Sequence, residues 1–201
     1  MRPVLVTLGG TRERIDDVRF ISNLSTGRTG CVIARALGAA GFKVTCLCGG
    51  GAERPEGKNV RIVEFTDFKD LNLKMKLLLR TAVFDAVIHL AAVGDYSVES
   101  VSAGARTFRP GRCGKIPSTG RTLTLVLKKN FKILDRIKEY ANGHAGPYEP
   151  LLAGFKLTSG ASRTQVLESV RSMKAADLVV HNDLAEMKEG HPFHIYRNGT
   201  K

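Results

Sequence analysis

The sequence predicts a doubly wound α/β domain, in which a mostly parallel sheet carries helices on both faces. Segments with the pattern of strands alternate with segments of helical periodicity over nearly all 201 residues. Residues 86–93 are apolar without alternation, which is typical of a parallel strand buried on both faces. The first apolar run, residues 4–8, stops at a glycine turn, where doubly wound sheets bind ligands. Together these observations predict a Rossmann-like architecture.

Each element follows from a local pattern. After the strand at 4–8, Ser25 or Thr26 can cap a helix that runs to about Ala40, because apolar residues recur at helical spacing and Gly41 is a natural stop. Asp67 caps a second helix, with Leu71, Met75 and Leu78 on its apolar side. Further helices are expected at 130–140 and 161–175, the former with Ile133, Leu134 and Ile137 inward. Further strands are expected at 43–48, 60–65, 86–93, 122–127, 151–157, 177–182 and 194–196.

One long segment breaks this alternation. Residues 97–121 are rich in Gly, Ser, Pro and Arg and show little periodicity. A stretch of that length without regular structure is uncommon in a compact domain and is typically a lid or a binding loop. We therefore expect one nucleotide-binding domain over 1–201, with a mobile basic flap at about 97–121.

The charge is concentrated in the same region. The formal net charge is +12, and residues 101–139 contain ten Lys or Arg against two acidic residues. Such a patch attracts anions: nucleotide phosphates, a phosphorylated metabolite or nucleic acid. A solvated face that maintains solubility is the alternative. The aromatic content of 6%, with no Trp, argues against a surface that stacks nucleic-acid bases.

The first strand opens into Gly9, Gly10 and Thr11, where glycines let backbone N–H groups approach phosphate oxygens. The expected helix begins after an inserted loop, at Ser25, Thr26 and Gly27, and a helix N-terminus with hydroxyls and a glycine attracts anions. Two candidate phosphate-binding elements therefore flank the loop. Taken alone, the glycine turn is equally compatible with a simple tight turn.

Other candidate residues follow the ends of later strands. Ala91 and Ala92 permit close approach of a flat base or an acyl chain, and Asp95 can hold a ligand hydroxyl, an amino group or hydrated Mg²⁺, or bond its own backbone in a turn. Phe155 and Lys156 offer an aromatic ring and a cation, or else a core Phe and a surface Lys. Lys115 lies in the flap, where a cation can close over a triphosphate.

Several classes of protein are not indicated. No zinc pattern, Ser–His–Asp arrangement or Walker A sequence is present, and the four Cys are expected to be reduced thiols. His89, inside a buried strand, is expected to be a core residue. The first apolar run is too short for a signal peptide or a membrane span, so we expect a cytoplasmic protein with no membrane partner.

At this point the motifs resemble a known family, phosphopantothenate–cysteine ligase (phosphopantothenoylcysteine synthetase), in its free-standing bacterial form. The resemblance rests on GGTRERIDDVRFISNLSTG at residues 9–27 and continues in order over essentially the whole chain. The later motifs are AAVGDY at 91–96, KIPS at 115–118, LKKNFKIL at 127–134, GFKL at 154–157 and ADLVVHND at 176–183.

The resemblance implies a reaction of coenzyme A biosynthesis. The carboxylate of 4′-phosphopantothenate attacks the α-phosphate of a nucleoside triphosphate, CTP in most bacteria and ATP in animals, and pyrophosphate leaves. The amine of cysteine then attacks the acyl-nucleotide and forms an amide. Mg²⁺ is the implied cofactor, and the implied assembly is a homodimer without nucleic acid. Neutralisation of charge matters more in this chemistry than acid–base groups.

Residue roles carry over by motif position. Asn23 matches the asparagine that handles the acyl-nucleotide intermediate, and Lys115 matches the loop lysine that neutralises the triphosphate. Asp95, Ala92 and Phe155 fall where the family holds the nucleotide. The chain departs from the family at Pro117, where serine is usual, and a proline is expected to stiffen the loop. Relatives also continue beyond the last strand into a terminal helix, whereas this sequence ends at Lys201.

Two other functions predict different features. An NAD(P)-dependent oxidoreductase predicts a G-x-G-x-x-G turn and an acidic residue after the second strand, where this chain has Cys48 followed by glycines. A nucleic-acid-binding module predicts affinity that falls steeply with salt, and no turnover. The ligase is the favoured hypothesis.

Overall fold

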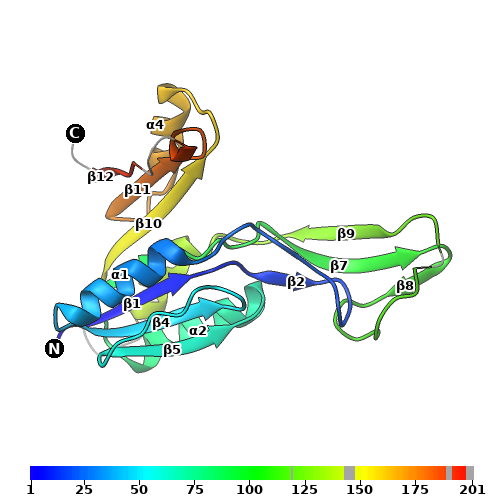
Figure 1. Cartoon of the computed structure of the whole chain (residues 1–201), viewed down its shortest axis with the longest axis horizontal. Helices are drawn as coiled ribbons and strands as arrows, with labels where there is room; N and C mark the ends of the chain where they lie inside the picture. The colour runs from blue at the N-terminus through cyan, green and yellow to red at the C-terminus, as the bar shows by residue number, and fades with distance from the viewer. Residues whose placement is uncertain (119, 143–147, 189–191, 198–201) are drawn as a thin grey trace.

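The computed structural model describes residues 1–118, 120–142, 148–188 and 192–197, which are organised around one large sheet (Figure 1). Over these residues the sheet has seven strands, in the order β12-β11-β10-β6-β1-β4-β5. Every neighbouring pair is parallel except β11 and β12. The strands are β1 (Pro3–Leu8), β4 (Lys43–Gly49), β5 (Val60–Phe65), β6 (Ala86–His89), β10 (Leu151–Thr158), β11 (Leu178–Asp183) and β12 (His194–Arg197).

The strand order winds away from β1 in both directions. β4 and β5 lie on one side of β1, whereas β6, β10 and β11 lie on the other. This doubly wound, Rossmann-like order confirms the predicted fold class. The winding reverses between β1 and β6, and the crevice beyond the carboxyl ends of two such strands is the usual ligand site of these sheets.

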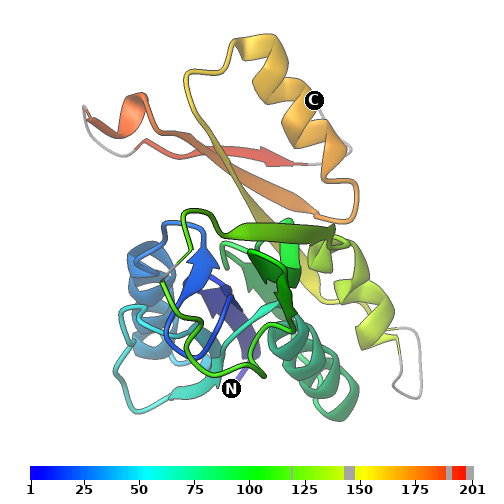
Figure 2. The same cartoon turned by 90° about the vertical axis from the view of Figure 1, so that its right-hand side faces the viewer.

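Helices cover both faces of the sheet (Figure 2). α1 (Arg28–Ala39) packs on β1, β4 and β5, over a cluster that includes Val6 and Leu8. The opposite face is covered by α2 (Phe68–Thr81), α3 (Ile137–Ala141) and α4 (Arg163–Ser172). Two short 3-10 helices are η1 (Ile133–Arg136) and η2 (Glu186–Lys188). None of the helices in the described part of the chain has the length and apolar character that crossing a membrane requires.

The N-terminal cap of α2 agrees with the prediction from the sequence, whereas that of α1 differs. Asp67 caps α2 as predicted, since its carboxylate accepts from the Asp70 backbone N–H at 2.9 Å. Leu71 and Met75 are buried, Leu78 is partly buried and packs against the same cluster as predicted, and Leu79 is buried as well. The N-cap of α1 is Gly27, in a left-handed conformation, rather than Ser25 or Thr26.

Beyond the main sheet, residues 12–22, 96–118 and 120–129 form a projection that we call the arm (Figure 1). The inserted loop contributes a hairpin of β2 (Arg12–Arg14) and β3 (Phe20–Ser22). The second part is a three-stranded antiparallel sheet in the order β8-β7-β9. Its strands are β7 (Tyr96–Ala103), β8 (Arg106–Phe108) and β9 (Thr124–Lys129).

Three expected elements therefore need correction. The stretch 97–121 contains β7 and β8, because β7 pairs with β8 on one side and with β9 on the other, instead of packing on the main core. The strand expected at 86–93 ends as β6 at His89 and continues only as an isolated bridge between Gly10 and Ala92. The helix expected from residue 130 begins as η1 at Ile133, although Ile133, Leu134 and Ile137 are buried as predicted.

Candidate functional site

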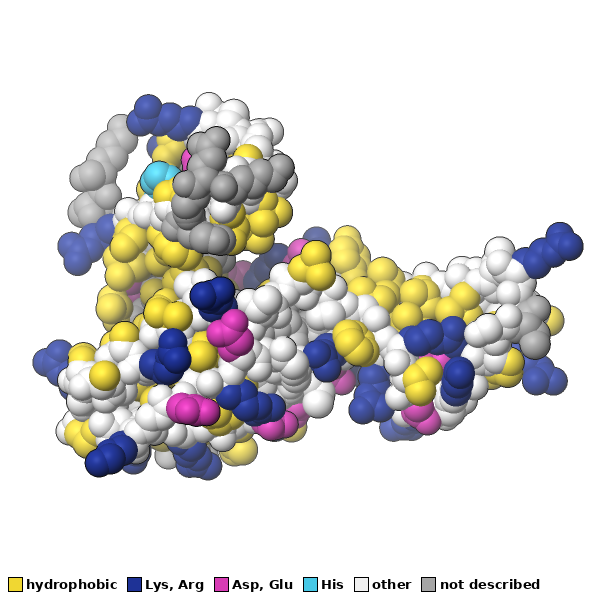
Figure 3. All heavy atoms as spheres, viewed as in Figure 1, with side chains coloured by type: hydrophobic (Ala, Val, Ile, Leu, Met, Phe, Trp, Pro, Cys, Tyr) yellow, Lys and Arg dark blue, Asp and Glu magenta, His cyan; other side chains and the backbone are white. Residues whose placement is uncertain are grey.

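A cavity of about 780 Å³ opens at the carboxyl ends of β1 and β6, within the range typical of small-molecule sites. It lies between the N-terminal end of α1 and the strands β10 and β11, where the space-filling view shows the surface hollowed (Figure 3). Of the predicted residues, seven line it together: Gly9, Ser25, Thr26, Gly27, Ala91, Ala92 and Phe155. The doubly wound topology therefore places residues far apart in the sequence around one cavity.

Two glycines shape the side of this cavity that lies at the start of α1. Gly9 has φ +82°, and a Cβ there would lie 2.8 Å from the Ala52 Cβ and 3.1 Å from the Gly49 backbone nitrogen. Gly27 has φ +72°, and its Cβ would also lie 2.8 Å from the Ala52 Cβ. Both positions therefore require glycine, for conformation as well as space. They let the turn after β1 and the start of α1 pack closely, side by side.

The N-terminal end of α1 carries no side-chain cap and no acidic residue in its first turn. The Thr26 hydroxyl accepts weakly from the Arg28 N–H, at 3.3 Å. Backbone N–H groups at the start of a 12-residue helix, together with the helix dipole, favour an anion at this point. The geometry is compatible with a phosphate at Ser25, Thr26 and Gly27, and the phosphate site stays a prediction.

A buried polar relay holds the alanines on the opposite wall. The Ala91 N–H donates to the Thr7 hydroxyl at 3.0 Å, and that hydroxyl lies 2.9 Å from Nδ1 of His89. Burial lowers the pKa of His89 to about 4, so the imidazole is neutral near pH 7. His89 is thus a core residue, as its place in a buried strand predicted, and it acts on the site only by supporting Thr7.

The rest of the glycine turn is structural. The Thr11 hydroxyl is buried and accepts from the Gly94 N–H at 2.9 Å. A Cβ at Gly10 would lie 2.9 Å from Oγ of Ser22 and 3.0 Å from the carbonyl oxygen of Asn23. Neither residue lines the cavity. They fix the turn so that Gly9 can line it.

Phe155 and Lys156 are neighbours on β10, so their side chains point to opposite faces of the sheet. Phe155 lines the cavity and Lys156 does not. An aromatic ring in the wall fits a nucleotide base. Asn182, at the end of β11, lines the cavity beside it.

Asn23 and Asp95 lie next to the cavity rather than in its wall. Asn23 directly follows β3. Its side-chain amide donates to the Val93 carbonyl at 3.2 Å, and this bond connects the hairpin to the residues that follow β6. The Asp95 carboxylate pairs with the Lys132 ammonium at 2.5 Å, with both side chains more than half exposed. Among the described residues, no three His, Cys, Asp or Glu side chains gather as a metal cage. Mg²⁺ is commonly held by one or two carboxylates plus substrate phosphates, and a single exposed carboxylate is compatible with that mode.

Lys115 lies in the arm, between Gly114, which has φ +58°, and Ile116, which is buried. It does not line the cavity. Lys115 and the cavity are therefore separate parts of the structure. The role of Lys115 stays a prediction, as do those of Asn23, Asp95, Lys156 and the predicted residues that line the cavity.

Sequence reasoning also missed residues of the cavity wall. Glu53 and Phe193 line it from loops, where no periodicity or motif marks them. Leu24 lines it too, and its side chain is fully exposed. Its place inside the 9–27 motif was the one available signal.

Comparisons with known proteins agree with this architecture. Residues 1–199 match the family model described as the DNA/pantothenate metabolism flavoprotein C-terminal domain. The chain is similar to the coenzyme A biosynthesis bifunctional protein CoaBC of Thermococcus kodakarensis, with 32% identity over 184 residues, 90% of this chain and 41% of the relative. The corresponding protein of Mycobacterium tuberculosis is 30% identical over 201 residues, 98% of this chain and 44% of the relative.

Among solved structures, the DNA/pantothenate metabolism flavoprotein from Streptococcus pneumoniae superposes with a TM-score of 0.85 at 30% identity. The match covers 100% of this chain and 90% of that one. Against the curated bifunctional relatives, by contrast, the chain spans only about two fifths of their length.

Proposed function

The chain belongs to the family of the DNA/pantothenate metabolism flavoprotein C-terminal domain, and from this premise we propose that it joins 4′-phosphopantothenate to L-cysteine, using CTP. The observation that carries the proposal is the cavity between the Gly9 turn, the start of α1 and Phe155. It offers helix N–H groups to phosphates and an aromatic wall to a base. The names of the curated relatives, coenzyme A biosynthesis bifunctional proteins, supply the metabolic context.

The proposed chemistry has two steps. A carboxylate oxygen of 4′-phosphopantothenate attacks the α-phosphorus of CTP, the bond to the bridging oxygen breaks, and pyrophosphate leaves. The cysteine amine then attacks the acyl carbon, loses a proton, and expels CMP to leave the amide. Lys115 neutralises phosphate charge in the first step, and the Asn23 amide donates to the acyl oxygen in the second.

Mg²⁺ would supply further charge neutralisation on the phosphates, with Asp95 as the candidate carboxylate. The Asp95 carboxylate pairs with the Lys132 ammonium close to the strand end that borders the cavity. We place the reaction in the cytoplasm, with no nucleic-acid partner.

We also propose a homodimer assembled through the arm. Large apolar side chains are exposed there, and Figure 3 shows hydrophobic atoms along this projection. They include Phe20, Tyr96, Val126 and Leu127, which are 43–51% exposed. Exposed apolar surface of this kind commonly marks a protein–protein contact.

The test starts from ligand binding. Thermal melting with Mg²⁺ and CTP, ATP or NADH separates the ligase from a dinucleotide-dependent oxidoreductase, because a ligand that binds the folded state raises the melting temperature. We expect stabilisation by CTP. Pyrophosphate release should then require 4′-phosphopantothenate, and amide formation should require cysteine. Stabilisation by NADH alone would contradict the proposal.

Asn23→Ala tests the division of roles. Pyrophosphate release should persist, whereas amide formation should fall by about 10²-fold or more, the usual cost of losing an oxyanion donor. The matched control is Asn59→Ala, because the Asn59 amide also donates to a backbone carbonyl, that of Gly38 at 3.0 Å, away from the cavity. Equal activity of both variants in both steps would remove Asn23 from the mechanism.

A further inference from the structure

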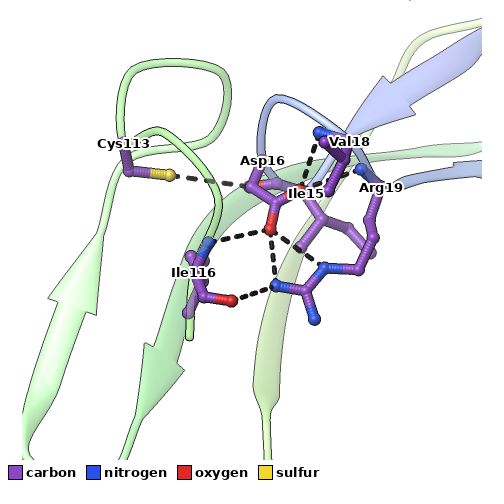
Figure 4. Close-up of polar contacts among 6 residues, drawn as sticks. All are labelled: Ile15, Asp16, Val18, Arg19, Cys113 and Ile116. Atoms are coloured by element: carbon purple, nitrogen blue, oxygen red, sulfur yellow. Dashed lines mark hydrogen bonds and ion pairs between the residues drawn. The ribbon is translucent and has the colours of Figure 1, made fainter. Parts of the chain in front are cut away.

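Asp16, in the turn between β2 and β3, has a side-chain carboxylate that accepts several hydrogen bonds (Figure 4). Its side chain is fully buried although the next residue, Asp17, is exposed. Oδ1 accepts from the backbone N–H groups of Val18 at 3.0 Å and Arg19 at 2.8 Å. Oδ2 accepts from Nε of Arg19 at 2.9 Å and from its Nη2 at 2.5 Å.

The same carboxylate reaches across 100 residues of sequence to the flap. Oδ2 of Asp16 also accepts from the Ile116 backbone N–H at 3.1 Å. Nη2 of Arg19 donates to the Ile116 carbonyl at 2.9 Å, so the Asp16–Arg19 pair holds both backbone polar groups of Ile116. On the other side of Lys115, Sγ of Cys113 lies 4.0 Å from the Ile15 carbonyl oxygen. The turn at 15–19 therefore anchors the segment 113–116 through these contacts (Figure 4).

This position requires a charged carboxylate. Five N–H groups point at the two carboxylate oxygens, and two of these N–H groups belong to the Arg19 guanidinium. The hydrogen bond from Arg19 holds the pKa of Asp16 well below its usual range against the opposing effect of burial, and the backbone N–H groups of Val18, Ile116 and Arg19 lower it further. An amide in its place would turn N–H groups toward N–H groups in a buried site.

Lys115 is placed by this contact. Gly114, in a left-handed conformation, precedes it, and the anchored Ile116 follows, so the backbone of Lys115 is held firmly from its C-terminal side. The same hairpin carries Asn23, one residue after β3. We propose that Asp16 is a positioning residue, which holds Lys115 on the Asn23 hairpin so that both serve one acyl transfer. This inference rests on the proposed ligase function.

The experiment compares Asp16→Asn with Asp17→Asn, a neighbouring exposed carboxylate outside the contact. We expect Asp16→Asn to lower kcat for pyrophosphate release by about tenfold or more, the scale of one lost charged hydrogen bond, with KM for CTP changed less than about twofold. The split is expected because the nucleotide cavity does not include Asp16. Asp17→Asn should match the wild type.

A double-mutant cycle separates positioning from general stability. Once Lys115→Ala has removed the side chain that Asp16 positions, adding Asp16→Asn should cost less than about a further twofold in the first step. A loss by the same factor in both backgrounds would assign Asp16 a purely structural role and overturn the proposal. If Asp16→Asn does not fold, Asp16→Glu, which displaces the carboxylate by one methylene, replaces it, and a wild-type kcat overturns the proposal.

Limited trypsin digestion tests the contact without turnover. Cleavage after Arg112 and Lys115 should be several-fold faster in Asp16→Asn than in Asp17→Asn, because the segment loses its anchor. If the wild type shows no pyrophosphate release with any triphosphate, the ligase function fails while this readout still reports the anchor. If the wild type turns over and the two variants behave alike in both assays, the ligase function stands and the positioning role fails.

Discussion

The main sheet and the arm are both built from β-strands, yet they are stabilised in different ways. Strands β1 and β4 are buried almost throughout, with Leu5, Val6 and Leu47 at 0% exposure. In the arm, β3 is exposed at every position and β9 at all but one. The main sheet therefore rests on apolar burial, whereas the arm rests on strand pairing and on polar contacts such as the Asp16 cluster.

The difference matters for function. The cavity lies on the main sheet, where two required glycines and a chain of buried hydrogen bonds fix its shape. Lys115 lies on the arm, where Val101 and Ile116 are buried but most strand positions are exposed, so the bonds of Asp16 to Ile116 weigh heavily on its position. A fixed binding site with a separately held cation suits a reaction in which substrates enter before charge is neutralised.

The largest predicted effect is at the centre of the main sheet. Leu152 on β10 is 0% exposed, and Leu152→Ala should lower the free energy of unfolding by roughly 3–5 kcal/mol through lost burial and a cavity. Leu151, the preceding residue, is 50% exposed, and Leu151→Ala should cost below about 1 kcal/mol. Urea unfolding measures both. Similar losses in the two variants would mean that burial does not distinguish the faces of this strand.

The second-largest effect is expected from acid, which should lower the free energy of unfolding. The pKa of His89 is lowered from 6.5 to about 4 by burial, so the unfolded state binds more protons than the folded state between these values. Stability should therefore fall as the pH drops from about 6.5 to 4, by about 3 kcal/mol at most, at roughly 1.4 kcal/mol per pKa unit. The pKa of His181 is also lowered by burial and adds in the same direction.

The measurement is urea unfolding at several pH values for the wild type and for His89→Gln. In the variant, the free energy of unfolding should depend much less on pH between pH 4 and 6.5, even if its value at pH 7 is lower. An unchanged slope would assign the acid sensitivity to other groups, with His181 as the first candidate.

The contrast between the two regions also explains what the sequence could predict. The buried runs of β1, β4 and β6, with helical spacing between them, were sufficient for the fold class, and the turns and motifs beside the strands indicated seven of the residues that line the cavity. In the arm, the strand predicted at 122–127 is present as β9, but β7 and β8 were not predictable, because strands that pair by long-range contacts outside the core leave no clear hydrophobic periodicity. The contact of Asp16 with Ile116 joins residues 100 apart, and no local pattern encodes it.

The smallest predicted effect belongs to the arm. Val126 on β9 is 46% exposed and pairs with Ser100 of β7, so Val126→Ala removes little burial within the chain. At low protein concentration the free energy of unfolding should change by less than about 0.5 kcal/mol. If the arm contacts a second copy, the loss should grow with protein concentration, because association stabilises the folded state by mass action. Urea unfolding at two concentrations a hundredfold apart distinguishes these cases. A loss above about 1 kcal/mol that is independent of concentration would show that the arm has an apolar core of its own, and the contrast between the two regions would then be wrong.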